Sequence, residues 1–237
     1  MFNFQSASTA IKPGRPEVHD FVARFADDLY DATAEQILST VNEHFPEELG
    51  ITVTLSMENT VLAELASRYL PRADFLFLDT GFHFPETLQT ADQVEARYPQ
   101  RLVRAQPLHP DQAPEGTWKE NPTLCCDIRK VEPLNSSLAN YDAWVTGLRR
   151  IDNPLRVNTP AVEVDKNGRL KINPIASWTL DDTENYIEEH NLIRNPLIAQ
   201  GYPSIGCLPC TRKVKPGEDP RSGRWAGFNK TECGLHT

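Results

Sequence analysis

Apolar side chains recur at helical spacing through the first fifty residues of the chain. Between residues 17 and 29 they are separated by three or four positions, which predicts an amphipathic helix. Thr33 followed three residues later by Gln36 is the capping-box pattern that begins a helix, and we expect Gly50 to end it. Residues 1–16 show no comparable pattern, so we expect them to form a loose lead-in.

The period of the hydrophobic pattern changes after residue 50. Short runs of apolar, mostly β-branched or aromatic side chains predict strands, at 51–55, 75–78, 102–103, 144–147 and 170–172. Helical spacing returns between the first three runs, at 61–69 and 85–98. Thr179 with Asp182 three residues later predicts the start of another helix. Alternating strands and helices are typical of an α/β protein with an open, mostly parallel sheet and helices on both faces.

Regular patterning ends near Asn195, and the remaining chain is rich in Gly, Pro and basic residues. We therefore expect an α/β domain over residues 17–200 and a separate C-terminal segment over residues 201–237. From residue 205 onward six Lys and Arg stand against three Asp and Glu, although the whole chain carries a net charge of −9. A basic end on an acidic protein predicts a local anion site, and a solvated charged tail is the simpler alternative.

Composition and charge argue against several classes of protein. The net charge of −9 disfavours broad nucleic-acid binding. No apolar run approaches the roughly 20 residues that a membrane span needs, and the N-terminal residues do not read as a secretory signal. We expect a cytoplasmic protein with one sizeable core that binds neither nucleic acid nor membrane.

Polar residues and glycines follow three of the predicted strands. Ser56 comes after the first, Asp79–Gly81 after the second and Gly147–Arg150 after a later one. Because parallel strands end at one edge of a sheet and ligands bind beyond that edge, these residues are candidates for a binding site. Each stretch taken alone also suits an ordinary turn between a strand and a helix.

Five cysteines are present, and four of them form two close pairs. Cys125 and Cys126 are adjacent, whereas two residues separate Cys207 from Cys210. Disulfides are rare in a reducing cytosol, so four thiolates at this spacing indicate a zinc ion or an iron–sulfur cluster. Two adjacent side chains reach one small ion with difficulty, whereas a cubane offers separated iron corners. We therefore favour a cluster over zinc and over four unliganded thiols.

The fifth cysteine, Cys233, lies close to the end of the sequence. Lys230, His236 and the nearby arginines would favour its thiolate, which is the nucleophilic form, and a surface thiol without function is the alternative. If the other four cysteines bind metal, an intermediate on Cys233 has no internal thiol to resolve it. Two reducing electrons must then come from a separate dithiol protein.

With these motifs the chain resembles the assimilatory adenylyl-sulfate (APS) reductases, close relatives of the 3′-phosphoadenylyl-sulfate (PAPS) reductases. The resemblance covers roughly residues 50–237. It rests on short motifs that lie far apart in the sequence: Leu78–Gly81, Phe84–Thr87, Cys125–Cys126 with Arg129–Lys130, Thr146–Arg150, Gly206–Cys210, Arg221–Trp225 and Glu232–His236. The double cysteine pair is the most diagnostic, because PAPS reductases look alike elsewhere but lack it.

The resemblance implies an adenine nucleotide α-hydrolase-like fold and the reduction of APS to sulfite and AMP, with thioredoxin or a similar dithiol protein as electron donor. It implies a 4Fe–4S cluster of structural and electrostatic role, held by Cys125, Cys126, Cys207 and Cys210. Cys233 would attack the sulfur of APS. The positions expected to bind substrate, from the family's motifs or from the strand ends, are Ser56, Asp79, Thr80, Gly81, Lys130, Gly147, Arg149, Arg150, Arg221 and Arg224.

The loop after the first predicted strand departs from related folds. ATP-using members of the wider fold carry a glycine-rich loop there, whereas residues 56–60 contain no glycine. A pyrophosphate would lose its close approach to the backbone, which disfavours ATP chemistry and fits a reductase. The rival interpretations are a PAPS reductase and a non-catalytic iron–sulfur or zinc module that senses redox state. A homo-oligomer is compatible with the sequence.

Overall fold

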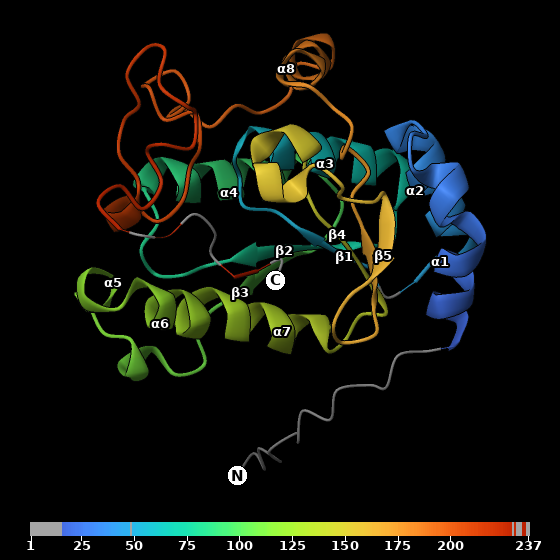
Figure 1. Cartoon of the computed structure of the whole chain (residues 1–237), viewed down its shortest axis with the longest axis horizontal. Coiled ribbons are helices and arrows are strands. Elements are labelled where there is room, and N and C mark those ends of the chain that lie inside the picture. The colour runs from blue at the N-terminus through green and yellow to red at the C-terminus, as the bar shows by residue number, and fades with distance from the viewer. Residues whose placement is uncertain (1–15, 48, 229, 231–233, 236–237) are drawn as a thin grey trace.

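The computed structural model describes residues 16–47, 49–228, 230 and 234–235 (Figure 1). The predicted lead-in therefore lies almost entirely outside the described residues. A six-stranded sheet of order β3-β2-β1-β4-β6-β5 forms the centre of the described part. Its strands in chain order are β1 (Leu49–Thr52), β2 (Asp74–Leu78), β3 (Leu102–Ala105), β4 (Ala143–Val145), β5 (Val162–Val164) and β6 (Leu170–Ile172).

Neighbouring strands run parallel except β5, which is antiparallel to β6 at one edge of the sheet. Along β2, the side chains of Phe75 and Phe77 join the core on one face, while Leu76 and Leu78 join a cluster on the other. Strands that are covered on both faces read as continuous apolar runs, which explains why such runs predicted them. The predicted α/β class and mostly parallel sheet are confirmed.

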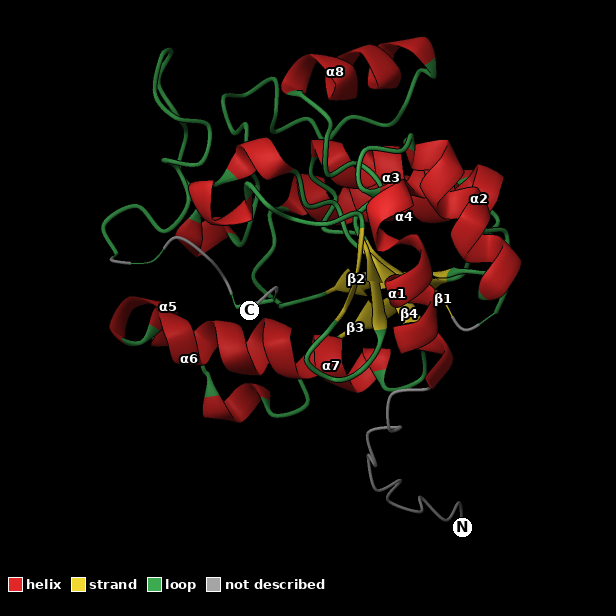
Figure 2. Ribbon diagram, turned by 45° about the vertical axis from the view of Figure 1, so that its right-hand side comes forward, coloured by secondary structure: helices red, strands yellow, loops and turns green. Residues whose placement is uncertain are grey.

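Helices cover both faces of the sheet, as Figures 1 and 2 show. One layer contains α3 (Met57–Tyr69) and α4 (Pro85–Arg97), with α2 (Ala34–His44) and α8 (Leu180–Glu189) packed on α3 and with α1 (Pro16–Leu29) beside β5. The other layer contains α7 (Glu132–Leu138), which contacts β2 and β3, and the short α5 (Thr117–Glu120) and α6 (Pro122–Cys126). Single 3₁₀ or π-helical turns complete the elements: η1 (Pro110–Gln112), η2 (Asp127–Val131), η3 (Arg150–Asp152), η4 (Pro154–Arg156) and η5 (Leu208–Cys210).

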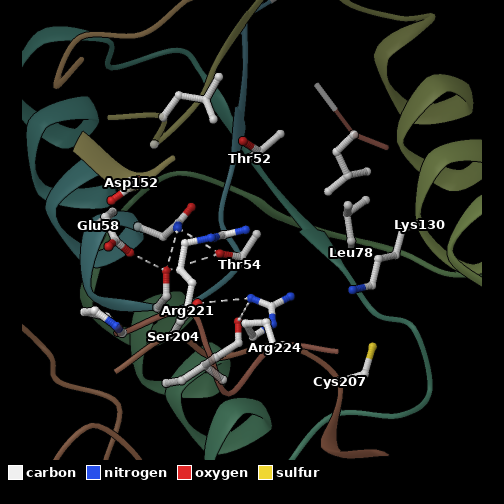
Figure 3. A pocket seen from close by; sticks show the side chains of 18 of the residues that line it. Thr52, Thr54, Glu58, Leu78, Lys130, Asp152, Ser204, Cys207, Arg221 and Arg224 are labelled. Carbon is white, nitrogen blue, oxygen red and sulfur yellow. Dashed lines mark hydrogen bonds between the residues drawn. The ribbon is translucent and has the colours of Figure 1, made fainter. Parts of the chain in front are cut away.

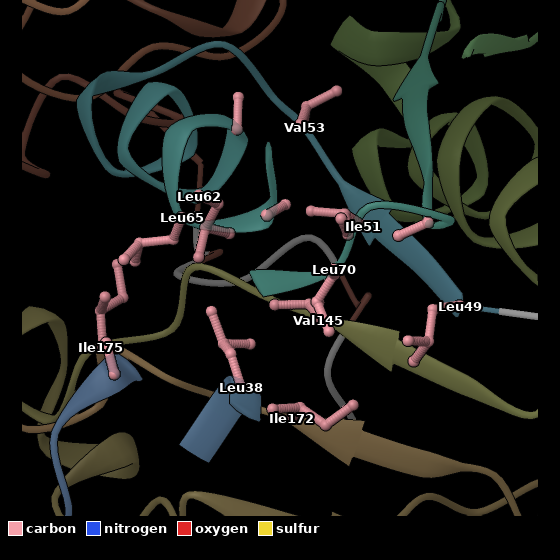
Figure 4. Packing of buried hydrophobic residues seen from close by; sticks show 14 of the residues in the cluster. Leu38, Leu49, Ile51, Val53, Leu62, Leu65, Leu70, Val145, Ile172 and Ile175 are labelled. Carbon is pink, nitrogen blue, oxygen red and sulfur yellow. The ribbon is translucent and has the colours of Figure 1, made fainter. Parts of the chain in front are cut away.

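The larger hydrophobic core lies between the sheet and the layer of α2 and α3 (Figure 4). Leu38 from α2 and Leu62 and Leu65 from α3 pack there with Ile51 and Val145 from the sheet. None of these side chains is more than 3% exposed, and burying one is worth about 1.5–3 kcal/mol. This packing fixes α3 so that its first turn meets the carboxyl end of β1.

The strand order places a crevice at the carboxyl end of the sheet. The chain runs outward from β1 through β2 to β3 and then adds β4 on the opposite side of β1. The connections that leave β1 and β4 therefore diverge, and open α/β sheets bind ligands in the crevice that such a reversal creates. Ser56 and Gly147, which follow β1 and β4, lie at this crevice.

Both predicted capping boxes are present. The backbone N–H of Gln36 donates to Thr33 Oγ1 (3.2 Å), and the N–H of Thr33 donates to Gln36 Oε1 (2.9 Å). Thr179 and Asp182 make the same reciprocal pair at the start of α8. The prediction that Gly50 ends the second helix is wrong, because α2 ends at His44 and Gly50 lies within β1. A Cβ atom at Gly50 would stand 2.7 Å from Leu76 Cδ1, so the glycine serves strand packing.

Three strands differ from the sequence-based prediction, and one of them is β4, which covers Ala143–Val145 and not 144–147. β1 ends at Thr52 and not at Leu55, because Leu55 has a left-handed backbone with φ of 59° that no strand allows. β5 was not predicted at all. Its three residues are too few to display an alternating pattern, and they form a strand only by pairing with β6 in a hairpin.

Beyond α8 the described chain contains only the single turn η5, which confirms the loss of regular patterning. Leu197 and Ile205 pack against Phe84 at the start of α4 and hold this segment against the strand ends. The division of the chain at residue 200 stays a prediction. None of the helices in the described ranges has the length and apolar character needed to cross a membrane.

Candidate active site

A cavity opens at the crevice between β1 and β4 (Figure 3). Its walls are the loops after β1, β2 and β4, together with parts of 203–207 and 220–225 from the C-terminal region. The predicted site residues that line it are Ser56, Thr80, Lys130, Gly147, Arg149, Cys207, Arg221 and Arg224. The fold therefore brings residues from widely separated motifs to one place.

The loop after β1 presents a network of polar side chains to the cavity. Asn59 Nδ2 donates to Thr54 Oγ1 (2.8 Å) and to Ser56 Oγ (3.1 Å). Ser56 Oγ in turn donates to Glu58 Oε2 (2.7 Å). Ser56 and Asn59 are buried, so these bonds hold the oxygens in fixed positions. Such a network suits hydrogen bonding with the hydroxyl or amino groups of a ligand.

Arg149 lines the cavity but already has carboxylate partners. Its Nη2 lies 2.8 Å from Glu58 Oε1 and 2.8 Å from Asp152 Oδ1, and its Nη1 donates to Thr183 Oγ1 (3.0 Å). Only 6% of the side chain is exposed. Arg149 thus links the loop after β4 to α3 and α8. Two carboxylates neutralise its positive charge, whereas the sequence predicted an arginine that would bind an anionic substrate.

The structure does not bring Arg150 to the cavity. Its guanidinium stacks on the ring of Tyr30, 3.8 Å from the ring centre, and Nη2 donates to the backbone carbonyl of Tyr30 (2.7 Å). Nη1 lies 3.0 Å from Asp31 Oδ1. These contacts direct the side chain toward the end of α1, away from the crevice, so the arginine pair that the sequence presents as one motif divides between two places.

The turn after β2 also divides the predicted residues. Asp79 Oδ1 accepts from the N–H of Gly81 (3.1 Å), which closes the turn, and neither residue is among those that line the cavity. Gly81 has a φ of 76°, which favours glycine. Thr80 does line the cavity, and its Oγ1 lies 3.3 Å from Cys207 Sγ.

Basic side chains form one wall of the cavity. Arg224 Nη1 donates to the backbone carbonyl of Ile205 (3.0 Å) and to Ser204 Oγ (3.3 Å), and its guanidinium lies 4.6 Å from the ring centre of Trp225. Arg221 and Lys130 line the same cavity. Figure 3 shows Lys130 and Cys207 toward one end, and Glu58 and Asp152 toward the other. The cavity is therefore basic at the end beside Cys207, while at the other end the carboxylates of Glu58 and Asp152 are paired with Arg149.

Gly206 makes room for the guanidinium of Arg224. A Cβ atom at Gly206 would lie 2.5 Å from Arg224 Nη2 and 2.6 Å from its Cζ. Any larger residue would push this flexible side chain away from the carbonyl of Ile205. The glycine in front of the second cysteine pair therefore places an arginine, a role that the sequence motif does not reveal.

The four paired cysteines share a second, smaller cavity beside the first. Cys125 and Cys126 come from α6, while Cys207 and Cys210 come from the chain at η5. The π-helical turn η2 directly follows the first pair, and Arg129 within it donates to the carbonyls of Thr80 (2.9 Å) and Ala113 (2.8 Å). Wide turns of this type are frequent at functional sites.

The donor set and its electrostatics fit an iron–sulfur cluster. Burial, with neighbouring thiolates as a further cause, raises the pKa values of Cys125 and Cys210 to about 11. Three of the four cysteines are buried and Cys210 is half-buried, so four thiolates gathered here would need a strongly cationic group at their centre. Across the described residues, no three Cys, His, Asp or Glu side chains form a group that could hold a metal ion. Cysteines arranged around a cavity suit a polynuclear group better than a single zinc ion.

Three residues belong to both cavities: Lys130, Cys207 and Trp225. Trp225 is 2% exposed and has a left-handed backbone with φ of 48°, and its N–H donates to the carbonyl of Cys210 (2.9 Å). A buried aromatic residue in this conformation is uncommon. The basic wall and the cysteine cavity are therefore parts of one continuous site.

Cys233 and His236 lie outside the described residues. Their described neighbours lie near the site. Gly234 lies beside Val131, and Leu235 lines the cavity and packs on the cluster of α7. Lys230 Nζ lies 3.3 Å from Thr123 Oγ1 on α6.

Several residues that line the cavity were not predicted to bind ligand. Glu58 and Asn59 lie two and three residues after Ser56, and their position at the start of a helix was a signal that could have indicated them. Asp152 and Arg156 belong to short 3₁₀ turns, which leave no period in the sequence. Ser204 gave no signal, because only the packing of the C-terminal segment brings it to the cavity.

His83 closes the turn after β2. Its Nε2 lies 2.8 Å from the carbonyl of Leu78, so this nitrogen donates and carries the proton of the neutral ring. The ring stacks on Phe77 with 4.9 Å between centres. Burial lowers the pKa of His83 below the usual 6.5, with the positive charge of Lys130 as a further cause. A neutral ring is therefore the native form at pH 7.

Comparison with known proteins gives consistent matches. Residues 48–213 match the phosphoadenosine phosphosulfate reductase domain family. An adenosine 5′-phosphosulfate reductase of Mycolicibacterium smegmatis is 46% identical, over 93% of this chain and 95% of its own length. One from Streptomyces coelicolor is 47% identical, over 96% of this chain and 99% of its own length.

A solved structure supports the fold. The crystal structure of phosphoadenylyl-sulfate reductase from Candida auris, in a phosphate complex, superposes with a TM-score of 0.71 at 26% identity. It covers 82% of this chain and 97% of that one. The adenine nucleotide α-hydrolase-like fold expected from the sequence is confirmed.

The lowered pKa of His83 predicts a pH dependence of stability. The unfolded chain binds a proton at about pH 6.5 and the folded ring does so only at lower pH, so unfolding free energy falls as the pH drops below 6.5. His83→Gln, which does not titrate, should lose less stability than wild type between pH 7.5 and 5.5 in urea unfolding. Equal losses in the two proteins would show that His83 is not the group responsible.

Proposed function

The chain belongs to the phosphoadenosine phosphosulfate reductase family, and on that premise we propose that it is an enzyme that reduces adenylyl sulfate (APS) to sulfite and AMP. Relatives that match over nearly their whole length carry the name adenosine 5′-phosphosulfate reductase. The observation that supports the proposal best is the junction of a cavity that has a basic wall with a four-cysteine cavity through Lys130, Cys207 and Trp225.

The polarity of the cavity suggests how APS binds. The hydroxyl and amino groups of adenosine match the polar network of Ser56, Glu58 and Asn59 at one end. The phosphosulfate matches the basic end, where Lys130 and Arg224 stand. Arginine forks suit phosphate and sulfate oxygens, and fixed positive charge stabilises the charge that moves onto the phosphate as AMP leaves.

The first chemical step is an attack by Cys233. Its thiolate sulfur forms a bond to the sulfur of APS, and the bond from that sulfur to the bridging oxygen breaks. The electron pair of the broken bond leaves with AMP, and Cys233 becomes an S-sulfocysteine. Support comes from Leu235, which lies two residues after Cys233 and lines the cavity, and from the basic side chains that would offset repulsion between two anions.

The second step needs a separate dithiol protein, such as thioredoxin. One thiolate of that protein attacks the Cys233 sulfur, and sulfite leaves with the electron pair of the broken S–S bond. Its second thiol then releases Cys233, and the partner ends as a disulfide after supplying two electrons. The count of cysteines supports this step, because the other four are committed to the neighbouring cavity.

The remaining cysteines, Cys125, Cys126, Cys207 and Cys210, would hold a 4Fe–4S cluster. When bound, the cluster would supply structural order and an electrostatic field beside the sulfate end of the cavity. We propose that the enzyme is cytoplasmic, since reduced thiols suit that compartment. We also propose that it binds neither nucleic acid nor membrane, and a homo-oligomer is compatible with this proposal.

The double cysteine pair favours APS over PAPS as the substrate, because the PAPS reductases lack this pair. In this chain the four thiols line one cavity. The matching family model and the similar yeast structure carry the PAPS reductase name, so the two nucleotides need direct comparison. Sulfite release from each, with thioredoxin as donor, separates the two functions. Faster turnover of the 3′-phosphorylated nucleotide would replace the first function with the second.

Cys233→Ser should abolish sulfite formation and should retain no label from APS that is labelled in its sulfate. The reason is that a serine hydroxyl cannot form the sulfur–sulfur bond that the mechanism requires. Wild-type protein mixed with the same APS and no dithiol serves as the control, and mass spectrometry should find the label on the peptide that contains Cys233. Sulfite release by the variant would remove Cys233 from its role.

Gly206→Ala should lower kcat/KM for APS by roughly 10²–10³, because the new methyl group displaces the guanidinium of Arg224. Arg224→Ala should cause a loss of similar size. Since both changes remove the same contact, the double variant should be no worse than Arg224→Ala alone. Losses that multiply in the double variant would mean that Gly206 acts through something other than Arg224.

A further inference from the structure

The backbone at Leu55 is strained where the chain leaves β1. Its φ of 59° lies in the left-handed region, which is a rare conformation for a bulky side chain. The side chain is fully buried in the main core, so a glycine could not replace it without leaving a cavity. A turn of this kind persists only where surrounding contacts hold it, and such strain is concentrated at functional sites.

Asn195 supplies the hydrogen bond that holds this turn from outside the loop. Its Nδ2 donates to the carbonyl of Leu55 (3.1 Å) and to Thr87 Oγ1 (3.3 Å), while its Oδ1 accepts from the N–H of Leu197 (3.1 Å). A carbonyl can only accept and an N–H can only donate, so these two contacts fix the orientation of the amide. Asn195 is 1% exposed, and its polar atoms are satisfied by these bonds.

The turn sets the position of the polar network that lines the cavity. Thr54 and Ser56 flank Leu55 directly, and Asn59 donates to both of their hydroxyls. A change in the Leu55 backbone would move Thr54 and Ser56 relative to each other. The loop lacks the glycine that would adopt this conformation without strain, so its shape depends on contacts from elsewhere.

The same amide also holds the opposite wall of the cavity. Leu197, whose N–H binds Asn195, packs with Ile205 and Phe84, and the carbonyl of Ile205 accepts from Arg224. One buried side chain thus joins the loop after β1 to the segment that carries the basic wall. Asn195 and the Leu55 carbonyl to which it donates are 140 residues apart in the sequence.

We infer that Asn195 is a positioning residue for the nucleotide end of the site, acting through the left-handed turn at Leu55. The inference rests on the proposed function, since it concerns the same cavity. Asn195 does not line the cavity, so it acts on a bound nucleotide only through Thr54, Ser56 and the wall beyond Leu197. Its loss should therefore weaken nucleotide binding more than it slows the chemical step.

The test uses two variants of Asn195 and one matched control. Asn195→Ala removes all three bonds, and Asn195→Asp keeps the oxygen that accepts from Leu197 but loses the donors. Thr87→Val removes a partner of the same amide without touching the Leu55 bond, and Thr87 is also fully buried. Thr87→Val therefore also loses a buried hydrogen bond at this place, and it measures the effect of such a loss when the Leu55 bond is kept.

We expect the Kd for AMP and the KM for APS to rise about tenfold in both Asn195 variants, with kcat changed less than about threefold. Thr87→Val should change either constant less than about twofold. Hydrogen exchange, measured by mass spectrometry, should be faster over residues 52–60 in the Asn195 variants and unchanged there in Thr87→Val. This second readout needs no turnover, so it stands if wild-type protein fails to reduce APS and the proposed function falls.

Two results would overturn the inference. One is an Asn195 variant that is folded and binds AMP as wild type does, with unchanged exchange over residues 52–60. The other is an equal loss of affinity in Thr87→Val, which would show that any lost bond at this place has the same effect. If Asn195→Ala does not fold, Asn195→Asp and the exchange measurement decide.

Discussion

Four thiols that share one cavity, three of them buried and that of Cys210 half-buried, are the constraint on which the rest of the site depends. Two come from α6 and two from the chain at η5, about 80 residues apart in the sequence, and Cys207 also lines the neighbouring cavity. Burial raises the pKa of Cys125 and of Cys210, so four thiolates can gather here only around a cationic group. The proposed cluster and the basic wall thus belong to one electrostatic unit.

The packing around this unit uses backbone contacts more than side-chain charges. The N–H of Trp225 holds the carbonyl of Cys210, Arg129 holds the carbonyl of Thr80, and Arg224 holds that of Ile205. Each bond joins segments that are distant in sequence. Glycine at 206 allows the last of them, because a side chain there would collide with the guanidinium. The result is a cavity whose basic end adjoins the cysteines and whose other end, where Arg149 pairs with Glu58 and Asp152, adjoins α3.

The sequence predicted the sheet well because its strands are buried on both faces, so their apolar runs stand out even when they are short. It missed β5, where pairing and not composition makes the strand, and it placed Gly50 at the end of a helix that stops at His44. At the site, motifs found Ser56, Thr80, Lys130 and Arg224, whose positions follow strand ends or fixed turns. They did not reveal that Arg150 points to α1 or that Asn195 holds Leu55, because those contacts depend on tertiary packing alone.

The measurement that tests the central claim most directly is the iron and acid-labile sulfide content of protein purified without oxygen. A 4Fe–4S cluster on Cys125, Cys126, Cys207 and Cys210 predicts about four of each per chain and absorbance near ~400 nm. Changing any one of these cysteines to serine should lower both contents, whereas Cys233→Ser should leave them unchanged. Stoichiometric zinc without iron, or iron-free protein that reduces APS at the full rate, would contradict the account.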